Sequence, residues 1–101
     1  MQPRIDFYTA SPDAIKAMMA LEGAVSKLPL EKSLIELVKL RASQINGCAF
    51  CIDMHTSDAL KAGETTRRLF AVTAWREAPF FTDRERAALA WTESLTELSK
   101  T

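Results

Sequence analysis

Hydrophobic positions recur every three or four residues through most of the chain, which is the spacing of amphipathic helices. The first such segment follows Ser11 and Pro12, residues suited to an N-cap and a first helical turn, and it ends before Pro29. A second helix is predicted from near Glu31 to Ile45, with an apolar face wide enough to be largely buried. The apolar positions of the two segments are Ile15, Met18, Leu21, Val25 and Leu28, then Leu34, Ile35, Leu37, Val38 and Leu40.

The middle of the chain predicts a third and a fourth helix. Asn46 and Gly47 are turn residues that break the second helix. A third helix is predicted over 48–62, with Gly63 as its C-terminal stop. A shorter helix is expected over 65–75.

The last third predicts an apolar loop over 76–81 and then a final helix. Thr82 and Glu85 have the spacing of a capping box that opens this helix. Its apolar stripe either packs on the preceding helices or is covered by another subunit or by a missing C-terminal part. No segment has a hairpin signal, so we predict an all-α, compact bundle of about five helices. The stripe consists of Ala88, Trp91, Leu95 and Leu98.

Composition narrows the class of protein. The 101 residues suit a single domain, 1–101, and 48% hydrophobic with 26% charged residues are typical of globular domains. Thirteen basic and thirteen acidic side chains cancel, so neither nucleic acid nor an anionic membrane is an expected partner. There is no apolar run of the roughly 18 to 20 residues that a membrane span needs. Pro3, Asp6 and Asp13 stand where a signal peptide would be apolar, so we expect a cytoplasmic protein.

The candidate chemistry lies at the start of the third helix. Cys48 and Cys51 are the two cysteines, and a disulfide that closes so short a loop would stabilise the fold little. On a helix Cys51 lies about 60° around the axis from Cys48, and His55 lies about 40° back towards Cys48. All three side chains therefore project from one face, and the two sulfurs can form a disulfide. The helix start and the imidazole both favour the thiolate, which is the reactive form of a thiol.

Other interpretations of these residues stay open at this stage. The cysteines could be ordinary half-buried thiols, and His55 could be a hydrogen-bonded core residue. A structural zinc site would use Cys48, Cys51 and His55 but needs a fourth ligand, for which only a carboxylate such as Glu36 or Asp53 is near in sequence. A c-type haem and a thioredoxin fold do not fit, because Ile52 follows the second cysteine and no βαβ pattern flanks the motif.

Spacing alone predicts that Glu36 is a surface acid. It lies on the polar stripe of the second helix, where Lys32 or Lys39 could pair with it at the surface. The same stripe includes Ser43.

The run from Glu36 to Gly63, ELVKLRASQINGCAFCIDMHTSDALKAG, resembles the alkylhydroperoxidase D-like group of the carboxymuconolactone decarboxylase family. The matching features are an acid twelve residues before the first cysteine, Asn-Gly-Cys, the CxxC pair, a histidine four residues on, and the Ala59/Gly63 spacing. The later segment WREAPFFTDRERAALAWTESLTEL is similar to the family's continuation, so the resemblance covers about residues 15–100. Family chains often continue with further helices beyond the point that corresponds to Thr101.

This resemblance implies an all-helical, oligomeric antioxidant enzyme that reduces hydroperoxides through its cysteine pair. We expect a homo-oligomer that uses a thiol or dithiol reductant and no cofactor or metal. The resemblance also implies a proton relay from Glu36 and His55 to Cys48 and Cys51. We expect Cys51 to be the attacking thiol because His55 lies one turn away, but the opposite order stays open because Cys48 is nearer the helix start. Some peroxidase members carry a second histidine where this sequence has Phe50. The alternatives are a redox-sensing or structural helical subunit and a zinc-bound module. The family's decarboxylase branch generally lacks the cysteine pair, so decarboxylation is not expected.

Overall fold

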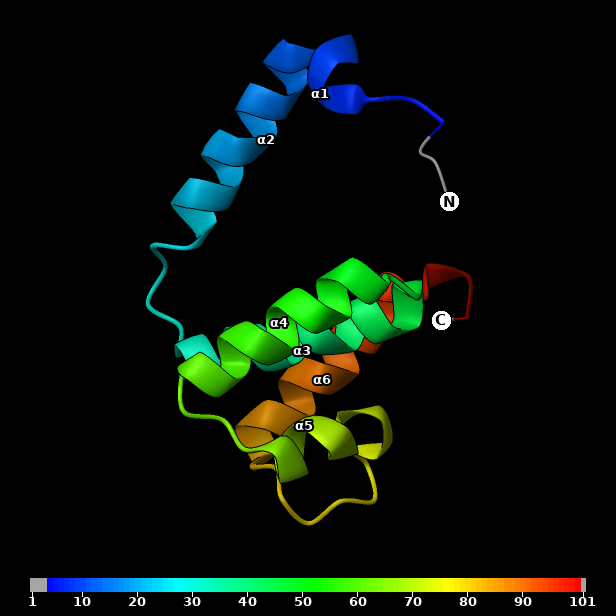
Figure 1. Ribbon diagram of the computed structural model, residues 1–101. Helices are drawn as coiled ribbons and strands as arrows, with labels where there is room; N and C mark the ends of the chain where they lie inside the picture. Colours follow the sequence, from blue (N-terminus) through cyan, green and yellow to red (C-terminus); the bar gives the residue numbers. More distant parts are fainter. Residues whose placement is uncertain (1–3, 101) are drawn as a thin grey trace.

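The computed structural model describes residues 4–100, and every regular element in this range is a helix. The all-α prediction is confirmed. Figure 1 shows α3, α4 and α6 stacked on one another with α5 beside them, whereas α2 stands away from this bundle. The helices are α1 (Phe7–Ala10), α2 (Pro12–Val25), α3 (Lys32–Asn46), α4 (Ala49–Lys61), α5 (Thr66–Ala71) and α6 (Asp83–Thr96), with 3₁₀ turns at Val72–Ala74 (η1) and Leu98–Lys100 (η2).

The predicted helix boundaries are close to those observed, because local signals set them. Gly47 ends α3 in the left-handed conformation, with φ of 67°, which a residue with a side chain rarely adopts. Thr82 and Glu85 form both hydrogen bonds of the capping box that opens α6. Ser11 precedes α2 as predicted, but its side chain makes no capping hydrogen bond. The predicted helix over 65–75 is divided into α5 and η1.

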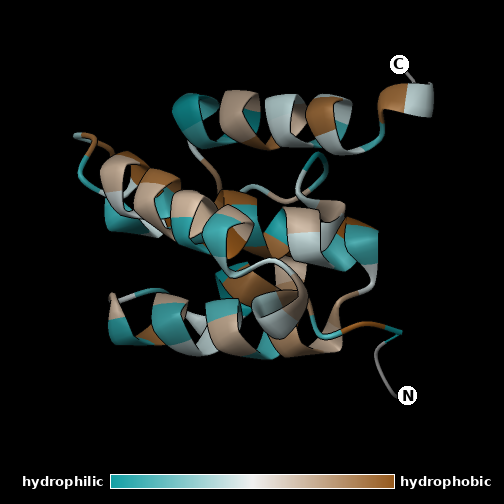
Figure 2. Ribbon diagram, turned by 90° about the horizontal axis from the view of Figure 1, so that it is seen from above, coloured by the Kyte–Doolittle hydropathy of each residue, from teal (hydrophilic) through white to brown (hydrophobic). Residues whose placement is uncertain are grey.

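The hydrophobic core lies where α3, α4, η1 and α6 meet. The buried face of α3 is the predicted one, since Leu34, Leu37 and Leu40 are all buried. Hydrophobic and hydrophilic residues alternate in short stretches along the helices, as amphipathic packing requires (Figure 2). The core cluster comprises Leu37, Leu40, Ala59, Leu69, Val72, Trp75, Phe81 and Leu89.

The stripe predicted for α6 is not the face that α6 buries. Leu89 is fully buried, whereas Trp91, Leu95 and Leu98 are 66%, 51% and 70% exposed. The expectation that this stripe packs on the preceding helices is therefore wrong for the described chain. The helix turns Leu89 and Glu93 towards the core instead, because Glu93 receives hydrogen bonds from Trp75 and Arg41.

The first helices form an arm outside the bundle. Only Ile15 within α2 is even partly buried, and the other apolar positions that predicted this helix are exposed to solvent. The radius of gyration is 15.1 Å, compared with about 13 Å for a compact domain of this size. Within residues 4–100 no helix has both the length and the apolar character that a membrane crossing requires.

Glu93 is expected to stabilise the bundle through a charged network. Its Oε2 accepts hydrogen bonds from Trp75 at 3.0 Å and from Arg41 at 2.9 Å, and Arg76 also binds this carboxylate. Burial would raise the pKa of Glu93, but the hydrogen bonds from Arg76, Trp75 and Arg41 together lower it to about 2. We predict that Glu93→Gln destabilises the fold by about 2 kcal/mol at neutral pH in urea unfolding.

The pH dependence of this effect has a defined sign. The pKa of Glu93 lies below the unfolded value near 4.5, so its stabilisation is fully present above that value and is lost as the pH falls towards 2. The difference in unfolding free energy between wild type and Glu93→Gln should therefore shrink on acidification. Glu77→Gln, at an exposed position of the same region, is the matched control. An equal loss in both variants at neutral pH would contradict this prediction.

Candidate active site

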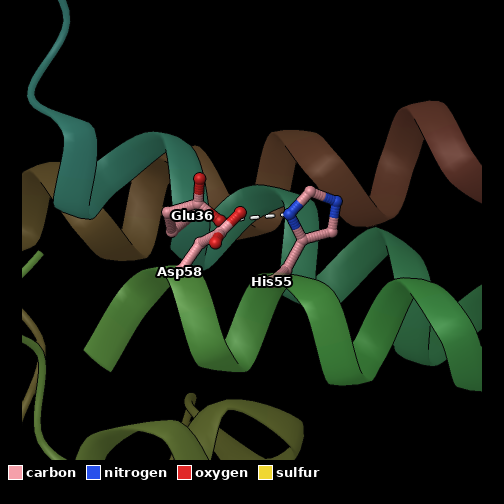
Figure 3. A group of neighbouring side chains, drawn as sticks. All are labelled: Glu36, His55 and Asp58. Atoms are coloured by element: carbon pink, nitrogen blue, oxygen red, sulfur yellow. Dashed lines mark hydrogen bonds and ion pairs between the residues drawn. The ribbon is translucent and has the colours of Figure 1, made fainter. Parts of the chain in front are cut away.

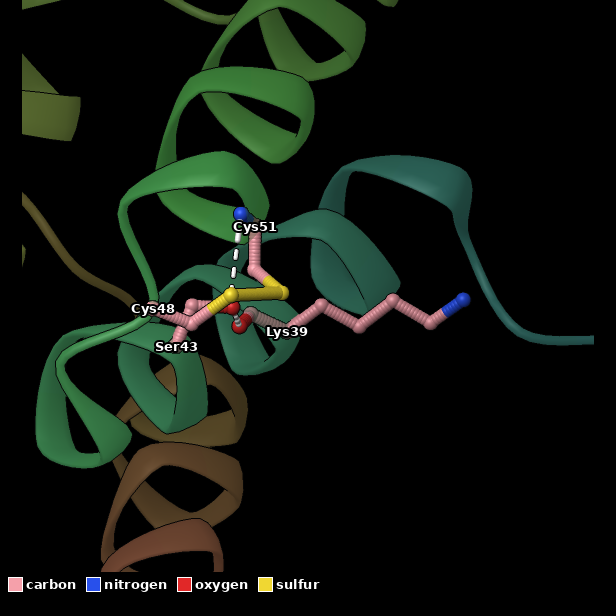
Figure 4. The surroundings of a disulfide bond; sticks show 4 residues. All are labelled: Lys39, Ser43, Cys48 and Cys51. Atoms are coloured by element: carbon pink, nitrogen blue, oxygen red, sulfur yellow. Dashed lines mark hydrogen bonds between the residues drawn. A yellow bond between two sulfur atoms is a disulfide. The ribbon is translucent and has the colours of Figure 1, made fainter. Parts of the chain in front are cut away.

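The turn between α3 and α4 places the two cysteines. After Gly47 the chain reverses, and the backbone N–H of Cys48 donates to the carbonyl of Ser43 at 3.1 Å. Cys48 is the N-cap of α4 and Cys51 lies in its first turn, with a Cα–Cα distance of 5.3 Å. The two side chains form a disulfide (Figure 4), so the prediction that the sulfurs can bond is confirmed.

The sulfur of Cys48 is also the helix cap. Its Sγ accepts a hydrogen bond from the backbone N–H of Cys51 at 3.2 Å. An N–H group at a helix start stabilises negative charge on the atom that it contacts. In the reduced chain this contact would favour the thiolate of Cys48. Both cysteines are partly exposed, so a small solute can reach them.

Glu36 and His55 form a largely buried pair between α3 and α4. His55 Nδ1 lies 3.0 Å from Glu36 Oε2, and the two side chains are 14% and 8% exposed. If the carboxylate is ionised, the Nδ1–H of His55 donates to it, which leaves Nε2 of a neutral imidazole free to accept a proton. The contact with Glu36 fixes the orientation of the His55 ring, and His55 lies one helical turn after Cys51 on α4.

The surface interpretation of Glu36 is therefore wrong. Lys39 does not pair with Glu36 but with Glu22 of the arm, Nζ to Oε1, at 2.9 Å. The hydrogen bond from Lys39, and then its charge, lower the pKa of Glu22. Two residues of the stripe that was predicted to be polar surface, Glu36 and Ser43, are instead buried beneath α4, with exposures of 6% and 7%.

Asp58 joins this pair and was missed by the sequence analysis. One ligand atom from each of Glu36, His55 and Asp58 lies within 4.8 Å of the others. Figure 3 shows Asp58 pointing from α4 towards Glu36. The available signal was its position three residues after His55, since such residues share a helix face. Asp53, the other aspartate weighed as a metal ligand, is exposed and outside this group.

A cavity of about 320 Å³ lies beside the site at the junction of the arm and α3. Glu36 lines it and contacts His55 on the other side. The side chain of Lys39, which lines the cavity, passes beside the disulfide (Figure 4) and pairs with Glu22 of the arm, so the cavity and the cysteines flank the same stretch of α3. The lining residues are Glu22, Val25, Ser26, Leu30, Lys32, Ile35, Glu36 and Lys39.

Comparison with known proteins decides the family. Residues 12–94 match the carboxymuconolactone decarboxylase family. The chain belongs to this family. The CxxC pair, Glu36 and His55 all lie inside the matched region.

Relatives of this carboxymuconolactone decarboxylase family member are longer proteins. The chain is 45% identical to the uncharacterized protein YdfG of Bacillus subtilis over 96 aligned residues. This alignment covers 95% of this chain and 65% of YdfG. The chain is 35% identical over 66 residues to the uncharacterized protein YnjA of Escherichia coli, covering 65% of this chain and 36% of YnjA. The chain therefore spans two thirds or less of the length of these curated relatives.

A solved structure supports the alkylhydroperoxidase D-like fold. The crystal structure of ATU0492 from Agrobacterium tumefaciens superposes with a TM-score of 0.90 at 45% identity, over 99% of this chain and 68% of that chain. ATU0492 is a protein of unknown function for which a role in antioxidant defence, as AhpD, has been suggested. The predicted fold and family resemblance are both confirmed.

Proposed function

We propose that this family member is a thiol-dependent peroxidase that reduces hydroperoxides with the Cys48–Cys51 pair. The observation that carries the proposal is the buried Glu36–His55 pair, which orients an imidazole one turn after a cysteine that takes part in a disulfide. A buried carboxylate that holds a histidine is a common way to prepare a general base. The suggested antioxidant role of ATU0492 agrees with this chemistry.

In the first proposed step His55 accepts the thiol proton of Cys51 at Nε2. The thiolate attacks one oxygen of the hydroperoxide, the O–O bond breaks, and Cys51 becomes a sulfenic acid. The imidazolium returns its proton to the departing oxygen, which leaves as an alcohol or as water. The sulfur is oxidised by two electrons and the peroxide is reduced by the same number.

In the second step the thiol of Cys48 attacks the sulfenic sulfur of Cys51. Water leaves and the Cys48–Cys51 disulfide forms, as it is found in the described chain. An external thiol or dithiol then reduces this disulfide by exchange. The hydrogen bond from Cys51 N–H to Cys48 Sγ supports Cys48 as the better leaving thiolate in that exchange.

The residues near the disulfide favour an organic hydroperoxide as substrate. Phe50 and Met54 on α4 are 76% and 39% exposed, and Val25, Leu30 and Ile35 line the adjacent cavity. Exposed apolar side chains beside a reactive pair suit a substrate with an alkyl group.

Single-turnover oxidation tests this proposal. Fully reduced protein is mixed with one equivalent of cumene hydroperoxide, and thiol loss and alcohol formation are followed together. We expect both thiols to be lost for each alcohol formed, at a rate at least about 100-fold above that of a free thiol. Oxidation at the rate of an ordinary thiol would contradict the proposal.

We also propose that the chain assembles as a homo-oligomer through its arm, residues 5–30. Helices of this length are marginal in water without a packing partner. The arm nevertheless exposes a run of large apolar side chains, which is typical of a surface that another chain covers. These are Ile5, Phe7, Tyr8, Met18, Met19, Leu21, Val25, Leu28 and Leu30.

Light scattering after size exclusion checks the assembly. We predict a mass at least twice the 11.3 kDa of one chain. Replacing Met18 and Leu21 by glutamate should shift the mass towards the monomer, because a buried charge at the contact is costly. Glutamate in place of Ala17 and Ala20, small residues of the same helix, is the comparison variant. A monomeric wild type would contradict the assembly.

A further inference from the structure

The cluster of Glu36, His55 and Asp58 has a feature that the peroxidase proposal does not use. It brings two carboxylates and one imidazole together, and the three donor atoms lie within 4.8 Å of one another. Within residues 4–100 the Asp58 carboxylate makes no hydrogen bond or ion pair, although it is partly buried and directed towards Glu36 (Figure 3). Two carboxylates so close together leave negative charge that a cation would compensate.

The donor set is chemically that of a divalent transition-metal site. Imidazole and carboxylate ligands suit zinc and its first-row neighbours, and three protein ligands with one open position are typical of a reactive zinc site. With bonds of about 2.0–2.2 Å, ligand atoms of a tetrahedral zinc lie about 3.3–3.6 Å apart. The Nδ1–Oε2 distance of 3.0 Å is already close to this value, and the Asp58 donor, within 4.8 Å of both atoms, would have to move closer to complete the set.

The packing around the Glu36–His55–Asp58 cluster would hold the ligands of an ion in place and leave the cluster open to small ions. Glu36 is 8% exposed and His55 is 14% exposed, so packing between α3 and α4 holds these two donors in place. Glu36 borders a cavity of about 320 Å³, and the side chains of His55 and Asp58 are partly exposed. The position is therefore preformed and not closed off from small ions.

We propose that Glu36, His55 and Asp58 form a binding site for a divalent transition-metal ion, with zinc as the best fit. The ion would take the place of the proton that Glu36 and His55 share. This site goes beyond the proposed peroxidase function, and it uses two members of the proposed relay. Zinc binding would therefore withdraw the base from Cys51 and stop turnover until the ion is removed.

Zinc affinity of the oxidised chain tests the site independently of any activity. With the Cys48–Cys51 disulfide intact the sulfurs cannot supply thiolate ligands, so binding reports on the cluster alone. Zinc is titrated into a mixture of the protein and a chromophoric chelator. We expect one zinc ion per chain, with magnesium and calcium unable to displace it.

Substitutions at Asp58 identify the ligands. Asp58→Asn should weaken zinc binding by about 10-fold or more, because one of three ligands is lost, whereas Asp58→His should keep it. Asp53→Asn, an exposed aspartate of the same helix, is the matched control and should bind as wild type. Circular dichroism establishes that each variant is folded. Absence of stoichiometric zinc binding, or equal binding by Asp58→Asn and Asp53→Asn, would overturn the proposal.

The outcomes for zinc and for peroxide are separable. Zinc binding by an oxidised chain that lacks peroxidase turnover would support the metal site and reject only the proposed function. Turnover that zinc leaves unchanged at saturating occupancy would reject the proposed link between the site and the relay.

Discussion

Cys51→Ser is expected to abolish hydroperoxide turnover, with a fall in kcat/KM of at least about 1,000-fold. The variant loses the sulfur that is proposed to attack the O–O bond, and a serine hydroxyl at this position is neither ionised nor oxidisable. The Glu36–His55 pair should remain, because it depends on the packing of α3 against α4 and not on the sulfur. Consumption of cumene hydroperoxide with dithiothreitol as reductant gives the rate.

Cys48→Ser is the matched variant, since it removes the other sulfur of the same disulfide. It should keep the first oxidation and stop at a sulfenic acid on Cys51, which a dimedone-type probe labels. The reverse pattern, with labelling at Cys48 in Cys51→Ser and none in Cys48→Ser, would contradict the assignment of Cys51 as the attacking thiol. It would favour the cysteine whose sulfur caps α4.

Glu36→Gln and His55→Gln should each reduce kcat/KM by about 100-fold or more, the usual contribution of general acid–base catalysis. In Glu36→Gln the ring of His55 loses the carboxylate that lies 3.0 Å from Nδ1 and fixes its orientation. In His55→Gln the proposed proton acceptor itself is lost. Because the two residues act as a unit, the double variant should lose little more than either single one.

A matched control separates the relay from the general charge of the region. Glu22→Gln removes a carboxylate that lines the same cavity as Glu36 but is exposed and pairs with Lys39. We expect this variant to keep its rate within about threefold of wild type, since a surface pair contributes little. Full activity of Glu36→Gln, with a folded protein by circular dichroism, would reject the relay.

The sequence predicted the helices well because their boundaries depend on neighbouring residues. The capping box of Thr82 and Glu85, and the left-handed turn at Gly47, act within four residues of the chain. Periodicity also predicted the buried face of α3, because Leu34, Leu37 and Leu40 lie on its core side whatever packs there. The disulfide followed from helical spacing in the same way.

The partners of a side chain in another element could not be predicted from periodicity. Glu36 lies on a stripe whose residue types are typical of a polar surface. Only the position of α4 buries it beside His55, which is nineteen residues away in the sequence. Spacing left Glu36 at the surface, and only the family resemblance placed it in the relay. Asp58 was missed because its neighbour Glu36 belongs to another helix.

The apolar faces of α2 and α6 show a second limit of prediction from periodicity. An apolar stripe indicates that something covers it, but it does not indicate what. Periodicity left open whether Trp91 and Leu95 lie against the preceding helices or under another subunit or a missing C-terminal part. Both are exposed, and the packing of α6 depends on Leu89 and on the hydrogen bonds to Glu93. The stripe of α2 likewise lies outside the bundle (Figure 1).

The central claim, that the Cys48–Cys51 pair is a catalyst of hydroperoxide reduction, is tested most directly by counting turnovers. Purified protein is supplied with excess cumene hydroperoxide and dithiothreitol, and the peroxide consumed per chain is measured above the uncatalysed rate. The account predicts many peroxide molecules per chain at a constant rate. Consumption that stops after one equivalent, as a redox sensor would show, or no consumption at all with both thiols free, would contradict it.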